Sequence, residues 1–210
     1  MRAGRKPVSR AEAQQQTRED VLDAAEELFL DKGYHETTVA KIAAAAGRTQ
    51  GAIYANFSSK ENLCYEVLQR RYARLFTNLV TQVGSSGEDL EDKIASFMRW
   101  WKTLAADTEL TVLAAEYALA VRNNPEQRAA ATSQIDTLRA LMTVAMQQNM
   151  ARTNTIEQAD EAVLAILATS SGLAGMRAAG TIDEPLSAEL MARTLRLWST
   201  QLAHTEPDGD

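Results

Sequence analysis

The chain has 210 residues with 36 alanines and only four prolines, none of them between residues 8 and 124, which predicts an all-α fold large enough to bury a core without disulfides or metals. A single cysteine and two histidines exclude a disulfide framework and a zinc or His-rich metal site, and the lack of an apolar run of about 18 residues excludes a membrane span or signal peptide, so we expect a cytoplasmic protein without cofactor. The net charge of -6 is uneven: residues 1–80 hold 12 Lys and Arg against 10 Asp and Glu, whereas residues 81–210 hold 10 against 18, which indicates a nucleic-acid-binding end joined to an acidic remainder.

The first helix is predicted to begin at Thr17, after a flexible basic arm that covers residues 1–16. The arm is polar and aperiodic, as disordered segments are. Its Arg5 and Lys6 are candidates to follow a minor groove or the phosphate backbone, although such arms are more often simple tails. Thr17 is a suitable cap, an acidic first turn follows it, and apolar residues then recur at helical spacing until Gly33 ends the helix.

Two short helices follow, at about 38–45 and 49–57, and a turn that contains Gly47 separates them. Thr37 is the expected cap of the first helix. Two short helices joined by a tight glycine-containing turn form the helix-turn-helix layout. Residues 17–62 are therefore predicted to be a three-helix DNA-binding domain.

Six further helices are predicted, which gives a chain of about nine helices, with no internal repeat and no strand-like alternation. A capping box of Ser58 with Glu61 opens a long helix at about 59–82 that belongs to both regions. The later start signals are Ser86, Asp107, Asn124 with Pro125, Thr155 with Gln158, and Pro185. The helix from Asn124 is expected to reach about Ala151, and residues 205–210 are expected to be a disordered tail.

One combination of residues has a specific order and spacing: Gly33-Tyr34, Thr38-Val39, Ile42-Ala43, Ala46-Gly47, Gly51, Tyr54, Phe57 and Lys60-Glu61. This pattern, together with Thr17-Arg18 and the stretch 22–34, resembles the DNA-binding segment of the TetR family of transcriptional regulators. The resemblance covers about residues 17–68 and implies a variable ligand-binding and dimerisation domain, here residues 63–204. Arg48 and Asn56 depart from the family's frequent choices, a small apolar residue and His, so no base preference is transferred.

The third helix is the expected reader of DNA, because a helix fits the major groove and meets base edges with its N-terminal residues. The Gln50 amide suits adenine, the Ala52 methyl suits a thymine methyl, and Gly51 permits a close backbone approach. Phosphate contacts are expected from capping threonines, from residues further along the helix and from Lys60 at the next helix N-terminus. The full set is Thr37, Thr38, Arg48, Thr49, Gln50, Gly51, Ala52, Tyr54, Asn56 and Lys60.

Each of these residues also has an explanation without DNA. The threonines and Ser58 are explained as caps alone, and Tyr54 as a core ring with a surface hydroxyl. Lys41 and Arg48 are explained as solvated charges.

A single reading helix contacts few base pairs, and at roughly 1–3 kcal/mol per mismatch it cannot select one site in a genome. We therefore expect a homodimer on a palindromic double-stranded operator. The last two helices offer a small-residue face and matching bulk for a four-helix interface, at Leu164, Ala168, Ser171, Gly175, Met191, Leu195, Trp198 and Leu202. Packing within one chain explains the same residues.

Aromatic and flexible side chains on three helices form a candidate apolar ligand pocket: Phe97, Met98, Trp101, Tyr117, Met142 and Met146. An ordinary core explains them equally well. The resemblance favours a small apolar effector here, which would act by tilting the helix at 59–82 and so separating the two reading helices.

Three other functions are considered. An enzyme is disfavoured, since there is no HExxH motif, no glycine-rich phosphate loop and no nucleophile with a plausible partner: His35 lies by the helix-turn-helix and His204 in the tail. A helical interaction module without DNA binding is disfavoured by Gln50, Tyr54 and Lys60. A ligand-independent regulator or an activator with the same fold stays open.

Overall fold

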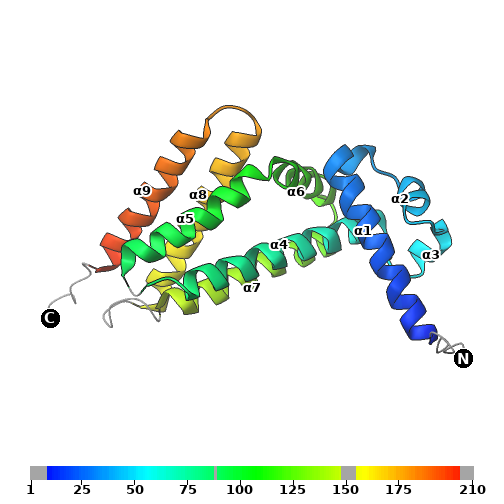
Figure 1. Cartoon of the computed structure of the whole chain (residues 1–210), viewed down its shortest axis with the longest axis horizontal. Coiled ribbons are helices and arrows are strands. Elements are labelled where there is room, and N and C mark those ends of the chain that lie inside the picture. The colour runs from blue at the N-terminus through cyan, green and yellow to red at the C-terminus, as the bar shows by residue number, and fades with distance from the viewer. Residues whose placement is uncertain (1–8, 88, 148–154, 204–210) are drawn as a thin grey trace, which may run out of the picture.

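The computed structural model describes residues 9–87, 89–147 and 155–203, and all regular structure in these ranges is α-helical (Figure 1), which confirms the predicted fold class. None of the helices described is long and apolar enough to cross a membrane. The helices are α1 (Arg10–Glu36), α2 (Val39–Ala45), α3 (Gln50–Tyr54), α4 (Lys60–Gly84), α5 (Leu90–Ala106), α6 (Thr108–Val121), α7 (Pro125–Gln147), α8 (Ile156–Ala178) and α9 (Glu184–Ala203).

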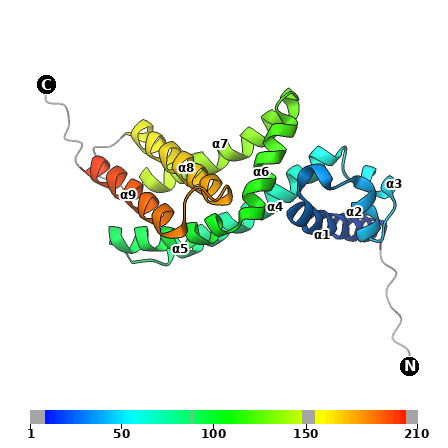
Figure 2. The same cartoon turned by 90° about the horizontal axis from the view of Figure 1, so that it is seen from above.

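The three N-terminal helices form a head at one end of an elongated molecule, and α5, α8 and α9 lie at the other end (Figures 1 and 2). Two long helices, α4 and α7, extend between these ends and contact each other, and α6 lies where the head meets the remainder. The head packs on α4 and α6 through α1. We refer to α5–α9 as the body.

The first helix begins earlier than predicted, because a capping box precedes the apolar periodicity. The Ser9 hydroxyl accepts from the Glu12 N–H at 3.1 Å, and the Ser9 N–H donates to the Glu12 carboxylate at 2.7 Å. Thr17 is an interior residue, since its hydroxyl donates to the Ala13 carbonyl oxygen. The predicted arm is therefore wrong from Arg10 onward, and residues 1–8 lie outside the described residues.

Gly33 was predicted to end the first helix, but it only interrupts α1. Its φ of 76° and ψ of 173° break the helical path, and helical backbone resumes up to Glu36. The positive φ is a conformation that glycine adopts without the steric cost of a Cβ. The last turn of α1 is thereby offset from the rest of the helix.

The capping signals of the later helices are mostly confirmed. The side chains of Asp107, Asn124 and Thr155 each accept a backbone N–H three residues on, and Thr155 forms its capping box with Gln158. Pro185 is the second residue of α9. The predicted end of α7 near residue 151 and the tail at 205–210 lie outside the described residues.

Among the later helices, two predicted caps are wrong. The cap of α4 is Ser59, which accepts from the Asn62 N–H at 3.1 Å, one residue beyond Ser58. Ser86 caps nothing, because its hydroxyl donates to the Val83 carbonyl oxygen behind it, and α5 begins at Leu90.

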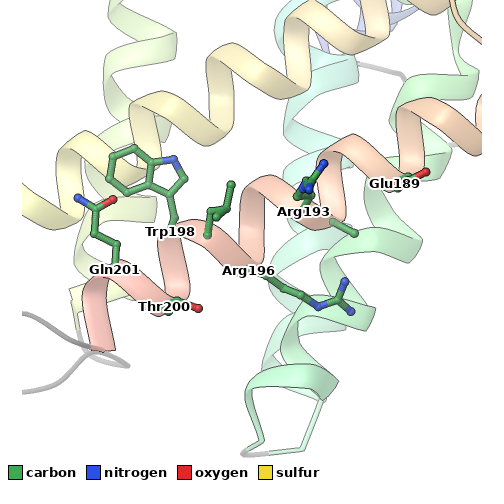
Figure 3. A pocket seen from close by; sticks show the side chains of 8 residues that line it. Glu189, Arg193, Arg196, Trp198, Thr200 and Gln201 are labelled. Atoms are coloured by element: carbon green, nitrogen blue, oxygen red, sulfur yellow. The ribbon is translucent and has the colours of Figure 1, made fainter.

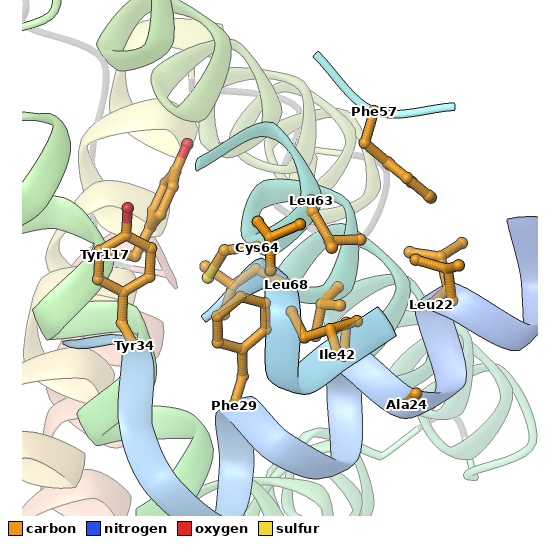
Figure 4. Packing of buried hydrophobic residues seen from close by; sticks show 14 of the residues in the cluster. Leu22, Ala24, Phe29, Tyr34, Ile42, Phe57, Leu63, Cys64, Leu68 and Tyr117 are labelled. Carbon is orange, nitrogen blue, oxygen red and sulfur yellow. The ribbon is translucent and has the colours of Figure 1, made fainter. Parts of the chain in front are cut away.

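Buried apolar side chains form two separate clusters. The first joins α1, α2 and α3 to the first half of α4 and to α6, with Phe29, Leu63 and Leu113 completely buried (Figure 4). Cys64 lies in this cluster, and burial raises the pKa of its thiol to about 12. The second cluster joins α5, α8 and α9 around Trp101. The core of the head is thus completed by helices that the sequence assigns to the other domain.

Charged residues also fasten α1 to α4. The Glu26 carboxylate accepts from Arg74 at 2.6 Å and from Arg70 at 2.5 Å, and only 12% of its side chain is exposed. Burial opposes ionisation of this carboxyl, but the hydrogen bonds from Arg74 and Arg70 prevail and lower its pKa. Arg71 pairs with Asp107, the cap of α6, so the same row of arginines reaches the body.

Candidate nucleic-acid interface

Helices α2 and α3 form a helix-turn-helix whose geometry follows from three local features. Thr38 caps α2 by accepting the Lys41 N–H at 3.2 Å, and Thr49 caps α3 by accepting the Ala52 N–H at 3.1 Å. Between them Gly47 takes a φ of 62°, which allows the tight turn. Ile42 and Ile53 anchor the two helices in the head core.

The outer face of α3 presents the predicted reading residues. Thr49, Gln50 and Gly51 are exposed at its N-terminal end, and Ala52 is half-buried. The Tyr54 side chain is 55% exposed, so the alternative that places its ring in the core is wrong. The helix is shorter than predicted, ending at Tyr54.

Asn56 follows α3 and is half-buried. Its amide N–H donates to the Ala52 carbonyl oxygen at 2.8 Å, so a carbonyl oxygen at the C-terminal end of α3 has a hydrogen-bond donor. In this position the side chain stabilises α3. The second N–H of the same amide is left for the predicted phosphate contact.

The structure contradicts the predicted roles of Thr37 as the cap of α2 and as a phosphate contact. Its side chain is completely buried, and its hydroxyl donates to the Leu28 carbonyl oxygen at 3.0 Å inside the head. The cap of α2 is its exposed neighbour Thr38. Thr37 therefore stabilises the junction of α1 and α2 and is excluded from the phosphate contacts.

Arg48, in the turn before α3, is paired within the chain. Its Nη2 lies 2.5 Å from Oδ2 of Asp20 on α1. The hydrogen bond from Arg48, aided by Gln16, lowers the pKa of the Asp20 carboxyl. The predicted phosphate or guanine contact of Arg48 thus competes with Asp20, and the alternative of a freely solvated charge is wrong.

Lys60 is the first residue of α4 and is half-buried. Its Nζ lies 4.1 Å from the centroid of the Tyr34 ring, a cation–π contact, and burial lowers its pKa. Lys60 belongs to the first turn of α4, and a helix N-terminus favours an anion through its free backbone N–H groups. Its position is set by Tyr34 at the end of α1.

The sequence analysis missed the pairing of two residues at this interface, Asp20 and Tyr34. Asp20 lies 28 residues before its partner Arg48, and Tyr34 meets Lys60 only in the folded head. Helical periodicity reports which face of one helix is apolar, and it carries no information about pairs between helices. Within the described ranges no group of three His, Cys, Asp or Glu side chains is arranged to hold a metal ion.

Residues 21–67, which contain this helix-turn-helix, match the family of bacterial regulatory proteins known as the tetR family. Residues 21–67 are thus a TetR-family segment. The matched segment ends within α4. The predicted resemblance is thus confirmed on the residues that form the head.

Two relatives show how far the sequence similarity of this chain extends. It is 42% identical over 62 residues to the HTH-type transcriptional repressor BepR of Brucella suis, a match that covers 30% of this chain and 29% of that protein. It is 26% identical over 93 residues to the fatty acid metabolism regulator protein of Bacillus subtilis, covering 44% and 48%. The chain spans less than half the length of these curated relatives.

The fold is shared over a longer stretch. The transcriptional regulator FadR from Bacillus subtilis, solved in complex with stearoyl-CoA, superposes with a TM-score of 0.66 at 18% identity, covering 87% of this chain and 97% of that chain. At this identity the likeness establishes the fold alone. The body of this chain therefore has the same helical architecture as FadR.

The predicted pocket residues are only partly brought together. Trp101 is completely buried in the second cluster, and Phe97, Met98 and Met146 pack against that cluster. Tyr117 belongs instead to the first cluster, where its ring lies 6.3 Å from that of Tyr34, so its assignment to the pocket is wrong. Met142 is half-buried on α7.

Two surface hollows lie elsewhere. One lies along α9, where Trp198 and Arg196 leave the helix on opposite sides (Figure 3), and the other follows Arg70 to Asn78 on α4. Neither includes a predicted pocket residue. Trp101 has a distinctive feature nonetheless, because its indole N–H is buried and has no hydrogen-bond partner among the described residues.

The predicted dimer residues fall into two groups. On α8, Leu164 is 50% exposed, Ala168 and Ser171 are exposed, and Gly175 is half-buried. On α9, Met191, Leu195 and Leu202 are buried within the chain, so their assignment to a dimer interface is wrong and the alternative of intrachain packing holds. Trp198 is half-buried against the same cluster.

The exposed face of α9 carries other apolar residues. Leu190 is 37% exposed and Leu197 is 64% exposed. Both were absent from the predicted interface. An apolar surface on α8 and α9 is therefore available, but its α9 half differs from the predicted one.

Proposed function

We propose that this chain is a sequence-specific DNA-binding transcriptional regulator that acts as a homodimer and is released from a palindromic operator by an apolar ligand. The observation that carries the proposal is the presentation of α3. Gln50 is exposed at the N-terminal end of α3, which Thr49 caps. Within the described ranges no side chain forms a hydrogen bond with the Gln50 amide. A Gln amide in that position pairs with adenine in the major groove.

The proposal of a dimer is based on the exposed apolar residues of α8 and α9. Leu164, Leu190 and Leu197 expose apolar surface on these helices, at the end of the molecule far from the head. Exposed apolar groups of this kind favour burial against a second copy, and a two-fold contact places two reading helices on one side of the pair. The two half-sites of a palindrome then multiply the specificity of one helix.

The proposal of an apolar effector is based on the second cluster. Methionines and aromatic rings surround Trp101, and these side chains repack readily around an apolar guest. The buried indole N–H without a partner favours a ligand that brings a hydrogen-bond acceptor. An acyl compound fits both conditions, in keeping with the stearoyl-CoA bound to FadR.

Selection from a random DNA library with the full-length protein tests the proposal. We expect one palindrome to be enriched and to bind at least about a thousandfold tighter than scrambled DNA of equal length at physiological salt, with two proteins per site. Gln50→Ala should lose about 1–3 kcal/mol of discrimination at one base pair of each half-site. Gln147→Ala, an exposed helical glutamine on α7, is the matched control. Enrichment of no sequence, or unchanged discrimination by Gln50→Ala, would refute the proposal.

A further inference from the structure

The head and the body meet where α6 packs on α1. Tyr117 of α6 stacks on Tyr65 of α4, with ring centroids 6.5 Å apart, and lies edge-on to Tyr34 of α1 (Figure 4). Leu113, one turn earlier on α6, is completely buried in the same cluster. This apolar contact holds the two parts together, but apolar burial has no preferred direction and does not fix the angle between them.

A directional contact lies beside it. At the break in α1 the backbone N–H of Tyr34 donates to Oε2 of Glu116 on α6, at 2.6 Å. Gly33 makes room for this approach, since a Cβ at that position would lie 2.8 Å from the same carboxylate oxygen. A short hydrogen bond from a backbone N–H to an ionised carboxylate is among the stronger ones, and its strength depends on its angle.

Tyr34 also contacts α4 through its side chain. Its hydroxyl donates to the Glu61 carboxylate at 2.9 Å, and its ring lies under the Lys60 ammonium. Lys60 and Glu61 form the first turn of α4, directly after the helix-turn-helix. A single side chain thus links α6, through its own backbone, to the residues that flank the reading helix.

We propose that Glu116 is a positioning residue that sets the angle of the DNA-binding head on α6, and with it the separation of the two reading helices in the dimer. The inference rests on the proposed function, because a separation matters only for a protein that binds a two-part site. It assigns the control of head orientation to a contact between α6 and α1, in addition to the tilt of α4. Glu116 touches no DNA and acts through Tyr34.

The test uses two substitutions in the full-length protein. Glu116→Ala removes the acceptor, whereas Glu116→Gln keeps an acceptor oxygen at the same length and should largely restore the wild-type behaviour. Glu109→Ala, on the exposed face of the same helix, is the matched control. Thermal unfolding of each variant establishes that it is folded at the temperature of the assays.

The first measurement is hydrogen exchange at the Tyr34 amide, which needs no DNA. Glu116→Ala should exchange about tenfold faster there than wild type, and Glu116→Gln should stay close to wild type. The second measurement is the affinity for the selected palindrome, for a single half-site, and for palindromes with one or two base pairs inserted at the centre. Glu116→Ala should bind the palindrome about tenfold more weakly, keep its half-site affinity and lose the preference for one spacing.

Two results would overturn the positioning role. One is a Glu116→Ala protein with wild-type affinity and spacing preference. The other is an equal loss on half-site and palindrome, since that indicates a destabilised head. If the wild-type protein selects no sequence, the proposed function and the positioning role fall together, whereas failure in the variants alone removes only the positioning role.

Discussion

Arg48 in the turn before the reading helix and Asp20 on α1 form an ion pair, with 2.5 Å between Nη2 and Oδ2. The pair places a carboxylate beside the one basic group of that turn. Asp20 thus weakens the attraction of the turn for phosphate, and it also restrains the guanidinium near the exposed face of α3. The same acid has a second partner, the Gln16 amide on its own helix.

Removal of that acid should strengthen binding to any DNA. Asp20→Asn frees the Arg48 guanidinium for a phosphate, so we expect tighter binding to scrambled DNA and a salt slope that is steeper by about 0.9. Asp31→Asn removes the same charge from the exposed far part of α1 and is the control. Anisotropy titrations between 50 and 200 mM salt, about the range in which such contacts are lost, measure both. An equal gain in the control would assign the effect to net charge alone.

Thr37→Val should cost stability and leave DNA contacts intact. The substitution keeps the shape of the side chain and deletes the hydroxyl that donates to the Leu28 carbonyl oxygen, which typically costs about 1 kcal/mol of unfolding free energy. Urea unfolding followed by circular dichroism measures the loss. Unchanged stability combined with weaker binding to all sequences would restore Thr37 to the phosphate contacts.

The Glu26 ion pairs should make the stability depend on pH. Because the pKa of this carboxyl is lower in the folded state than its ordinary value of 4.5, its contribution is full above about pH 4.5 and is lost as the pH falls through the lowered value. Glu26→Gln should therefore cost about 2 kcal/mol at pH 7 and progressively less in acid. Unfolding free energies of wild type and variant over that range measure the difference. Glu27→Gln, exposed on the same helix, should show no such convergence.

The proposed dimer contact can be tested by introducing a charge. Leu164→Arg places a charge in an apolar interface and should give a monomer in sedimentation equilibrium, with lost affinity for the palindrome. Leu119→Arg is the matched control, because Leu119 is 59% exposed on α6, a helix that the proposed interface does not include. A Leu164→Arg protein that stays dimeric would move the interface elsewhere.

The effector site is probed with stearoyl-CoA, with free coenzyme A as control. We expect stearoyl-CoA to bind and to weaken operator binding, and Trp101→Phe to bind it about fivefold more weakly through loss of the indole N–H. Calorimetry gives the affinity and anisotropy the release from DNA. Unchanged affinity in Trp101→Phe would remove Trp101 from the site, and no binding at all would exclude this acyl ligand.

Local signals predicted much of the fold. Asp107, Asn124 and Thr155 mark helix starts because capping depends only on residues within one turn. The misses have local causes too. Ser9 and Glu12 lie ahead of the apolar pattern that was used to find α1, and Thr37 and Thr38 are chemically identical neighbours, so their sequence does not tell which is the cap.

The site was less predictable, because its details depend on contacts between helices. Apolar residues occur on both sides of α9, so spacing alone did not separate buried Met191 from exposed Leu197. In the same way, the sequence marked Arg48 as basic but could not show that Asp20 neutralises it. Periodicity describes one helix at a time, whereas burial and pairing are properties of the packed chain.

The buried cluster that joins the head to α6 limits how this protein can be recombined with its relatives. A chimera joined after the helix-turn-helix would place Phe29 and Tyr34 against the α6 of another protein. Leu113 and Tyr117 of the body would lose the residues that bury them here. The transplantable unit is therefore discontinuous: α1 to the first half of α4, together with the matching face of α6. Engineers who exchange DNA specificity between such regulators should graft that face as well, or restrict their changes to the exposed residues of α3.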